Sequence, residues 1–234
     1  MQPKVLGVIL AREGSKEIKL KNLIKINNIS LIKRTIYTAQ KSKLIDKLIL
    51  STESHKIISH VKDTNIEVPF IRSKKLATDK AKTFDVIRDA LHKSEKKYNI
   101  EFDLIIILQP TTPFRKTKTI DMAIKKLMKF NADVCMSIIK TSYPPEWAIE
   151  KNKNNRLKHL FKTGKNITRR QDFKPSYYPS GAIYILKKES LLKQNSILPN
   201  TNTIGIEVDH IEGINIDNQT QLEYAKYIAK KYKI

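Results

Sequence analysis

Basic and hydroxyl side chains gather around a glycine directly after the first apolar run of the chain. The segment reads Leu10-Ala-Arg-Glu-Gly-Ser-Lys16 and is followed by Lys21-Asn22. Glycine permits a tight turn whose backbone amides face an anion, and arginine and lysine add charge-assisted donors. The Gly-x-x-x-x-Gly-Lys-Ser/Thr spacing of a P-loop is absent. The segment therefore predicts a loop of another kind that holds the phosphates of a nucleoside triphosphate.

Three further segments place polar side chains next to apolar ones. They are Pro69 to Asp79, which contains Arg72, then Leu108-Gln-Pro-Thr-Thr-Pro-Phe-Arg115, and finally Ile214-Asn-Ile-Asp217. A glutamine directly after five apolar residues is oddly placed unless it meets a polar group there. A carboxylate such as Asp217 either caps a helix or binds Mg²⁺, which prefers one or two carboxylates together with substrate phosphates.

These segments need a scaffold, and the hydrophobic pattern supplies one. Apolar, β-branched runs predict strands at 5–10, 47–51, 104–108, 133–139, 182–186 and 214–216, with a short extended piece at 68–71. Helical spacing predicts helices at 30–41, 54–62, 83–97 and 117–130, and a last helix capped by Asn218 with Gln221 three residues on. This alternation indicates an α/β fold with a mostly parallel sheet wrapped by helices, in which ligands bind beyond the carboxyl ends of the strands.

The alternation breaks between residues 141 and 180. This stretch contains Pro144-Pro145, the only tryptophan, an Asn- and Lys-rich loop, and the Arg169-Arg-Gln-Asp172 cluster. We expect one domain over residues 1–234, with 141–180 as an excursion suited to a lid or to a subunit contact.

Composition narrows the choice of partners. The formal net charge is +22, but the lysines are spread from Lys4 to Lys233, with no RNA-binding aromatic signature and no zinc-finger spacing. We therefore expect an anionic small molecule rather than a nucleic acid. The longest apolar runs are too short to span a membrane, and the N-terminal run resembles a first strand rather than a signal peptide. Cys135 is the only cysteine, so no disulfide forms within the chain, and we expect a cytoplasmic location.

Taken in order, the segments resemble the cytidylyltransferases that activate nonulosonic acids, the CMP-sialic acid synthetase family. The family pattern is Ala-Arg-x-Gly-Ser-Lys, Lys-Asn, Arg-Pro-x-x-Leu-Ala-x-Asp, Leu-Gln-Pro-Thr-Ser-Pro-Leu-Arg, Arg-x-Gln, Asn-Gly-Ala-Ile-Tyr and Asp-Ile-Asp. The corresponding pieces here are 11–16, 21–22, 72–79, 108–115, 170–171, 180–184 and 215–217. One piece alone could match by chance, whereas the ordered set covers nearly the whole chain and is highly specific.

The resemblance implies a Rossmann-like nucleotidyltransferase that transfers CMP from CTP to a nine-carbon 2-keto sugar acid and releases pyrophosphate. By matching position, the residues that hold the CTP phosphates would be Arg12, Ser15, Lys16 and Lys21. The other nucleotide contacts would be Asn22, Arg72 and Thr83. The sugar acid would meet Gln109, Arg170, Gln171 and Tyr184, with Arg170 at its carboxylate. The groups that carry catalysis would be Arg12, Lys16, Lys21 and Asp217, with Asp217 as the Mg²⁺ ligand. The family is typically dimeric, with the region corresponding to 141–180 crossing to the partner.

Four positions depart from the family pattern: Glu53, Ser73, Ser180 and Asn215. Asn215 replaces an aspartate and is the weaker metal ligand, because an amide oxygen carries no negative charge. Three alternatives follow. The same fold could act on pseudaminic acid or on the eight-carbon Kdo, the chain could be a catalytically weakened nucleotide-binding protein, or it could bind nucleic acid.

Overall fold

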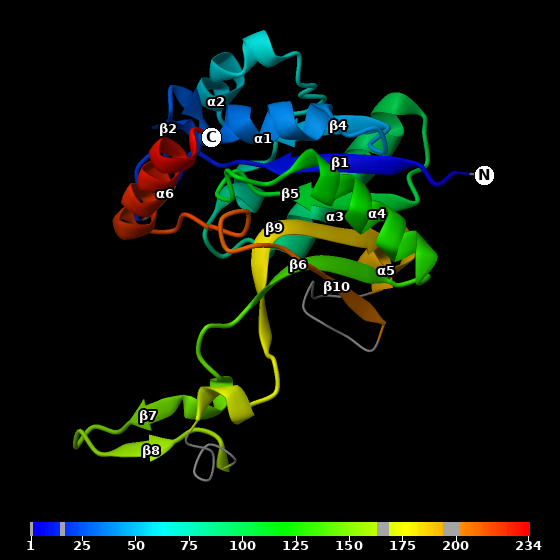
Figure 1. The fold of residues 1–234 in the computed structure, drawn as a ribbon. Coiled ribbons are helices and arrows are strands. Elements are labelled where there is room, and N and C mark those ends of the chain that lie inside the picture. Colours follow the sequence, from blue (N-terminus) through cyan, green and yellow to red (C-terminus); the bar gives the residue numbers. More distant parts are fainter. Residues whose placement is uncertain (1, 15–16, 163–168, 194–201) are drawn as a thin grey trace.

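A mixed six-stranded sheet lies at the centre of the molecule, as the computed structural model shows for residues 2–14, 17–162, 169–193 and 202–234 (Figure 1). The strand order is β10-β6-β9-β5-β1-β4. These strands are β1 (Val5–Leu10), β4 (Lys47–Ser51), β5 (Leu104–Leu108), β6 (Val134–Lys140), β9 (Tyr177–Lys187) and β10 (Thr203–Glu207). β1 pairs in parallel with β4 and β5, and β6 with β10. Only β9 runs against its neighbours, β5 and β6. The mostly parallel α/β sheet is thus confirmed.

Helices cover both faces of this sheet. The helices are α1 (Leu31–Gln40), α2 (His55–His60), α3 (Thr83–Tyr98), α4 (Thr117–Lys129), α5 (Lys188–Lys193) and α6 (Gln219–Tyr232). Apolar residues of α1, α2 and α4 share one core with alternate residues of β1 and β5. α3 and α5 pack on the residues in between, which point to the opposite face. The period of two in the strands therefore sorts the side chains into two cores.

The last helix lies over the edge where β1 and β5 end (Figure 1). Its start is as predicted, because Asn218 Oδ1 accepts from Gln221 N at 2.9 Å and Gln221 Oε1 accepts from Asn218 N at 3.1 Å. This capping box satisfies amides that the first turn leaves without partners. The apolar face of α6 packs on Ile26, Phe114 and the segment just before the helix.

One predicted strand is wrong. Residues 214–216 join no sheet; Ile216 N donates to Thr111 O at 2.9 Å, while Ile214 and Ile216 pack against α6. Two isoleucines in a stretch of three residues are too few to specify a strand when a helix offers an apolar partner. The extended piece at 68–71 likewise forms no strand, although Glu67 bridges Ile49.

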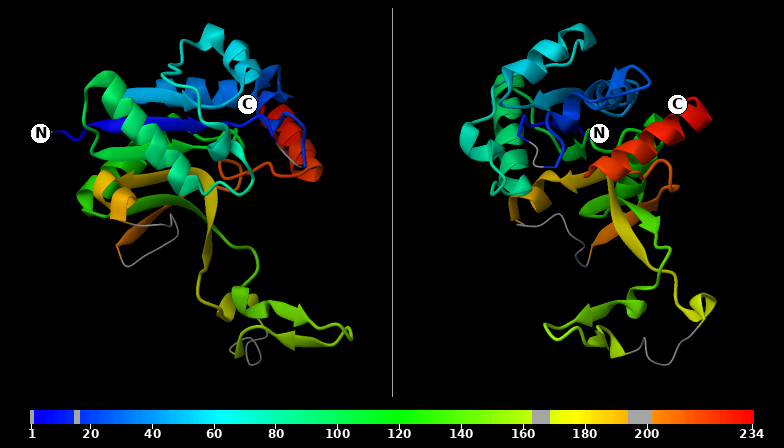
Figure 2. Two further views of the ribbon diagram at one scale, coloured as in Figure 1. Left: turned by 180° about the vertical axis from the view of Figure 1, so that it is seen from behind. Right: turned by 90° about the vertical axis from the view of Figure 1, so that its left-hand side faces the viewer.

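Residues 141–162 and 169–176 leave the sheet between β6 and β9 and form an arm that projects away from it (Figures 1 and 2). Two short turns, η4 (Pro145–Trp147) and η6 (Arg170–Asp172), flank a hairpin of β7 (Ile149–Lys151) and β8 (Leu157–His159). Large apolar side chains on this arm face solvent, among them Tyr143 at 74% and Leu157 at 61% exposure. The excursion begins at 141 as expected but ends before 180, because β9 already starts at Tyr177; its role as lid or subunit contact stays a prediction.

Candidate functional site

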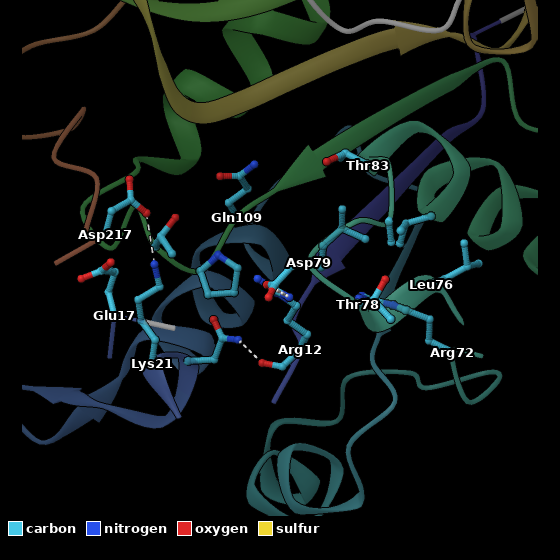
Figure 3. Close-up of a pocket in the computed structure, with 16 residues that line it drawn as sticks. Arg12, Glu17, Lys21, Arg72, Leu76, Thr78, Asp79, Thr83, Gln109 and Asp217 are labelled. Carbon is cyan, nitrogen blue, oxygen red and sulfur yellow. Dashed lines mark hydrogen bonds and ion pairs between the residues drawn. The ribbon is translucent and has the colours of Figure 1, made fainter. Parts of the chain in front are cut away.

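A cavity of about 460 Å³ opens beyond the carboxyl ends of β1 and β5 (Figure 3). Its walls come from the loop after β1, the 3-10 turn η1 (Lys21–Leu23), the segment from Arg72 to α3, the loop after β5 and the residues before α6. Seven of the predicted site residues line it: Arg12, Lys21, Asn22, Arg72, Thr83, Gln109 and Asp217. Segments remote in the chain therefore meet at the sheet edge where an α/β fold binds its ligands.

Arg12 points across the mouth of this cavity. Its Nη1 lies 2.6 Å from Asp79 Oδ1, in a pair whose side chains are 36% and 42% exposed. Asn22 fixes the backbone behind it, since Asn22 Nδ2 donates to Arg12 O at 2.9 Å and Asn22 is buried. An arginine held at its backbone, with its guanidinium on a surface carboxylate, is placed to exchange that carboxylate for a phosphate.

Lys21 and Asp217 face each other on the opposite side. Lys21 Nζ lies 3.1 Å from Asp217 Oδ1, and Asn215 Nδ2 donates to Asp217 Oδ2 at 2.5 Å. The Asp217 backbone amide donates to Gln221 Oε1 at 2.7 Å, so the capping box of α6 also orients this carboxylate. Asn215 Oδ1 is buried and meets no partner within the described parts of the chain. Asn215 thus orients Asp217 through its amide nitrogen here.

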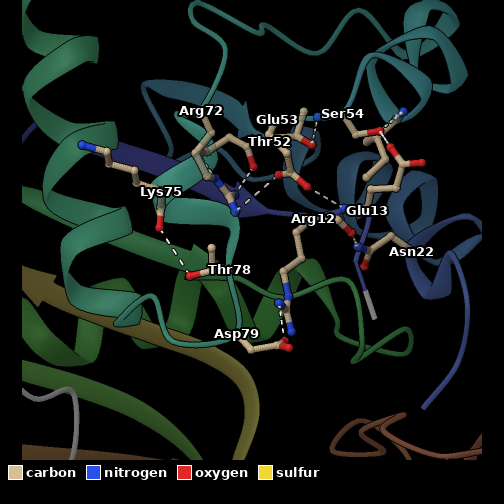
Figure 4. A network of polar contacts seen from close by, with 12 residues as sticks. Arg12, Glu13, Asn22, Thr52, Glu53, Ser54, Arg72, Lys75, Thr78 and Asp79 are labelled. Carbon is tan, nitrogen blue, oxygen red and sulfur yellow. Dashed lines mark hydrogen bonds and ion pairs between the residues drawn. The ribbon is translucent and has the colours of Figure 1, made fainter. Parts of the chain in front are cut away.

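Arg72 is turned back into the protein (Figure 4). It is 4% exposed, and its Nε donates to Ser51 Oγ at 3.0 Å while Nη2 bonds Ser51 O. Glu53 Oε2 lies 4.0 Å from Nη1, and Glu53 Oε1 accepts from Glu13 N at 2.8 Å. Burial lowers the pKa of Arg72, and the Glu53 charge opposes that shift. Arg72 therefore ties the wall before α3 to the end of β4, and Glu53 ties β4 to the loop after β1.

The charges on the cavity wall balance. The described lining residues include three cations, Arg12, Lys21 and Arg72, and three carboxylates, Glu17, Asp79 and Asp217. Glu17 lies beside Asp217 and Lys21 in Figure 3. The described chain holds no cluster of three or more histidine, cysteine or acidic side chains arranged for a metal. A metal here would need oxygens from a substrate to complete its shell.

A second cavity of about 650 Å³ adjoins the first at Gln109, which lines both. Tyr184 lies in its wall, half buried, and burial raises the pKa of its hydroxyl. Ser180, Gly181, His210, Asn215 and Tyr224 also line it. Among the residues that the structure describes, no arginine or lysine lines this cavity.

Two predicted sugar-site residues lie elsewhere. Arg170 and Gln171 are exposed on the arm, where they line a third hollow of about 460 Å³ with Pro144 and Phe173. The structure of this chain alone does not bring them to Gln109 or Tyr184. Ser15 and Lys16 lie outside the described residues.

Sequence reasoning assigned no role to two carboxylates of the first cavity, Glu17 and Asp79. Asp79 stands inside a segment already singled out and Glu17 directly follows another, so a count of charges in and next to those segments would have flagged them. The ion pair between Arg12 and Asp79 could not be read from the sequence, because the two residues meet only when β1 and the residues before α3 lie at one edge of the sheet.

No helix in the described parts of the chain is long and apolar enough to cross a membrane.

Known proteins resemble this chain over nearly its whole length. A family model described as cytidylyltransferase matches residues 6–233. The chain is 30% identical over 225 residues to CMP-N,N'-diacetyllegionaminic acid synthase of Campylobacter jejuni, covering 96% of this chain and 94% of the relative. It is 27% identical over 227 residues to pseudaminic acid cytidylyltransferase of the same species, covering 97% of each. A solved CMP:2-keto-3-deoxy-manno-octonic acid synthetase complexed with CTP shares the fold, with a TM-score of 0.71, 16% identity and coverage of 98% and 99%.

Proposed function

Because the chain belongs to the cytidylyltransferase family, we propose that it transfers CMP from CTP to the anomeric hydroxyl of a nonulosonic acid and releases pyrophosphate. Two adjoining cavities suit a reaction with two substrates. The first presents Arg12 and Lys21 to a triphosphate, and the second presents Gln109 and Tyr184 to a polyhydroxylated sugar. Gln109 lies in both, at the junction where the sugar hydroxyl would attack the α-phosphate.

The chemistry asks the protein for position and charge. The anomeric hydroxyl oxygen forms a bond to the α-phosphorus and gives up its proton to water. The bond from that phosphorus to the bridging oxygen breaks, and pyrophosphate leaves with the electron pair. Arg12 and Lys21 stabilise the negative charge on the phosphates, in a site where both are oriented before substrate arrives. The described lining residues of the first cavity include no histidine.

We propose that Mg²⁺ binds at Asp217 when CTP is bound. The donor set fits this ion, because Asp217 is an exposed carboxylate and Glu17 is a second carboxylate on the same side of the cavity. The metal would neutralise charge on the phosphates and on the departing pyrophosphate. When Asp217 takes up the metal, it would release Lys21 to the phosphates, because the lysine and the metal would compete for Asp217 Oδ1.

We further propose that the enzyme works as a homodimer. A sugar acid carries a carboxylate, yet the second cavity shows no arginine or lysine among its described lining residues. Arg170 stands on the projecting arm, which also carries large apolar side chains that are exposed to solvent in the single chain. A partner arm that docks over the second cavity would bury that apolar surface and bring a cation to the carboxylate.

The family resemblance of Arg170-Gln171 and Gly181-Ala-Ile-Tyr184 favours a nine-carbon acid over Kdo. A sialic- or legionaminic-type acid is the first candidate, and the pseudaminic acid relative makes that acid the second. Kdo is the third, from the solved structure that shares the fold. We propose a cytoplasmic location, where a chain with one buried cysteine needs no disulfide and CTP is available.

The observation that carries the proposal is the convergence of Arg12, Lys21 and Asp217 on one cavity that shares Gln109 with a second. The test is pyrophosphate release and product mass with CTP and a panel of legionaminic, sialic, pseudaminic and Kdo acids. We expect a CMP-sugar with at least one nine-carbon acid. CTP binding without transfer to any acid would instead indicate a weakened nucleotide-binding protein.

A further inference from the structure

A buried arginine ties together the segments that form the second cavity, although it does not line that cavity itself. Arg115 is 4% exposed and follows the loop after β5. Its Nη2 donates to Gln109 O at 2.7 Å and to Thr112 Oγ1 at 2.6 Å, while Nε bonds Ala182 O. One guanidinium therefore joins the end of β5 to the middle of β9.

The bonded carbonyls belong to the two sides of the cavity wall. Gly181, next to Ala182, adopts φ +79°, a conformation that favours glycine. A Cβ built on it would lie 3.6 Å from Gln109 Oε1 and 4.0 Å from Asn215 Cγ. Three segments of the second cavity thus approach one another within van der Waals distance, at Gln109, Gly181 and Asn215. The space for a ligand depends on how far apart the backbones of these segments are held.

Lys116, next to Arg115, holds the segment before Asn215 by similar contacts. Lys116 N donates to Glu212 Oε1 at 3.1 Å, and Lys116 Nζ lies 2.7 Å from Asp209 Oδ2. Glu212 is buried, and its charge partly offsets the effect of burial, which lowers the pKa of Arg115 to about 9. Arg115 and Lys116 therefore connect the loop after β5 to β9 and to residues 209–212.

A fixed arginine in such a place costs desolvation, so a merely apolar contact would stabilise the fold as well. What an apolar side chain lacks is direction: a guanidinium presents donors in a rigid fork, and Arg115 uses that fork on two backbones at once. Arg115 Nη1 stays buried without a partner among the described residues. The guanidinium therefore fixes the positions of two backbones without using all of its donors.

We propose that Arg115 is a positioning residue for the sugar acid: it sets the separation of Gln109 from Gly181 and with it the fit of the second cavity. The inference rests on the proposed function. The phosphate wall of the first cavity comes from Arg12, Lys21 and Asp217, none of which Arg115 contacts in its hydrogen bonds. Loss of Arg115 should therefore weaken the sugar acid far more than CTP.

The test compares Arg115→Lys, Arg115→Met and Thr112→Val with the wild type. Lysine keeps the charge but cannot reach both backbones, methionine removes every donor, and valine removes one acceptor of the network. The control is Arg88→Lys, because Arg88 also donates to backbone carbonyls, Leu191 O at 3.0 Å and Leu192 O at 3.2 Å, but away from both cavities. Thermal melting reports folding of each variant.

We expect Arg115→Lys to raise the KM for the sugar acid about tenfold and Arg115→Met to raise it further, with the Kd for CTP within about twofold of wild type. Thr112→Val should raise the KM for the acid less than either, and Arg88→Lys should leave both constants unchanged. Equal losses for CTP and the acid, or none for the acid in the folded variants, would overturn the role of Arg115. If Arg115→Met does not fold, Arg115→Lys and Thr112→Val decide the question. A wild type that uses no acid would instead refute the proposed function itself.

Discussion

Lys21 Nζ and Asp217 Oδ1 lie 3.1 Å apart at one end of the first cavity, although the two residues stand near opposite ends of the chain. The lysine is expected to serve a phosphate and the carboxylate a metal, so the pair joins the two charges that the reaction must later separate. Asn215 holds the other carboxylate oxygen at 2.5 Å, which leaves Asp217 oriented if Lys21 moves away. The two charges therefore neutralise each other in this structure, and under the proposed function a metal and a triphosphate would separate them together.

Lys21→Ala removes the cation from this pair. Removing one preorganised charge donor from a transferring phosphate costs on the order of 10²–10³ in turnover, so we expect a loss of that size in pyrophosphate release. Lys19→Ala is the matched control, because Lys19 is exposed and does not line the cavity. Near-normal turnover in a folded Lys21→Ala protein would exclude a phosphate role for Lys21.

Asp217→Asn keeps the shape of the side chain and removes its charge. We expect the Mn²⁺ or Mg²⁺ concentration for half-maximal CTP binding to rise about tenfold or more, and turnover to fall with it, because an amide is a poor ligand for these ions. Mn²⁺ binding measured by electron paramagnetic resonance with CTP present reports the metal directly, independently of activity. Glu223→Gln on the exposed side of α6 serves as control; an unchanged metal affinity in Asp217→Asn would move the metal to other residues.

Asp79→Asn concerns the second ion pair of the cavity. Arg12 now bonds Asp79 at 2.6 Å, so CTP must displace that carboxylate before Arg12 holds a phosphate. Both partners are partly exposed, so the pair is weak, and we expect the Kd for CTP to fall about two- to fivefold at low salt. The gain should shrink as salt is added. Asp172→Asn, which breaks an exposed pair with Arg169 on the arm, is the control. Weaker CTP binding in Asp79→Asn would show that Asp79 assists the nucleotide instead.

The sequence predicted those parts of the fold that depend on local pattern. The apolar runs of β1, β4 and β5 and the capping box at Asn218 and Gln221 lie where they were expected, because strand and cap preferences are set within a few residues. The gathering of Arg12, Lys21 and Gln109 also followed, since loops after parallel strands meet at one edge. Asp217 joins them from a segment that belongs to no sheet.

Features that depend on tertiary partners were not predictable. Ile214 and Ile216 pack on α6 rather than joining a sheet, and nothing in three residues decides between these partners. The eleven residues of β9 run antiparallel to β5 and β6, and the sequence pattern carries no sign of strand direction. Arg170 was expected at the sugar acid, but within one chain it lines a separate hollow on the arm, which meets the second cavity only at Ser142 among the described lining residues.

Cys135 gives a probe of the core. The thiol is fully buried in β6, and burial raises its pKa to about 11. At pH 8 the thiolate is scarce and shielded, so Ellman's reagent should leave the native protein unmodified and titrate one thiol after unfolding in guanidinium. Because the group is reached only when the core opens, the rate of slow labelling should follow the stability of the variants above. Rapid labelling of the native protein would contradict the buried position of β6.

Mixing two inactive variants tests whether Arg170 acts in the partner's site. If each site combines one subunit's cavity with the other's arm, Lys21→Ala damages the cavity and Arg170→Ala damages the arm. In a mixed dimer one site then carries both changes and the other carries neither. Random pairing of equal amounts makes half the dimers mixed, so we expect recovery to about a quarter of wild-type turnover. Co-folding the variants after dissociation, with each variant alone as control, measures this. Recovery requires a dimer with exchanged arms, whereas inactivity of the mixture, with a dimer present by sedimentation, would place Arg170 in the site of its own subunit. Full activity of Arg170→Ala by itself would place Arg170 outside the reaction.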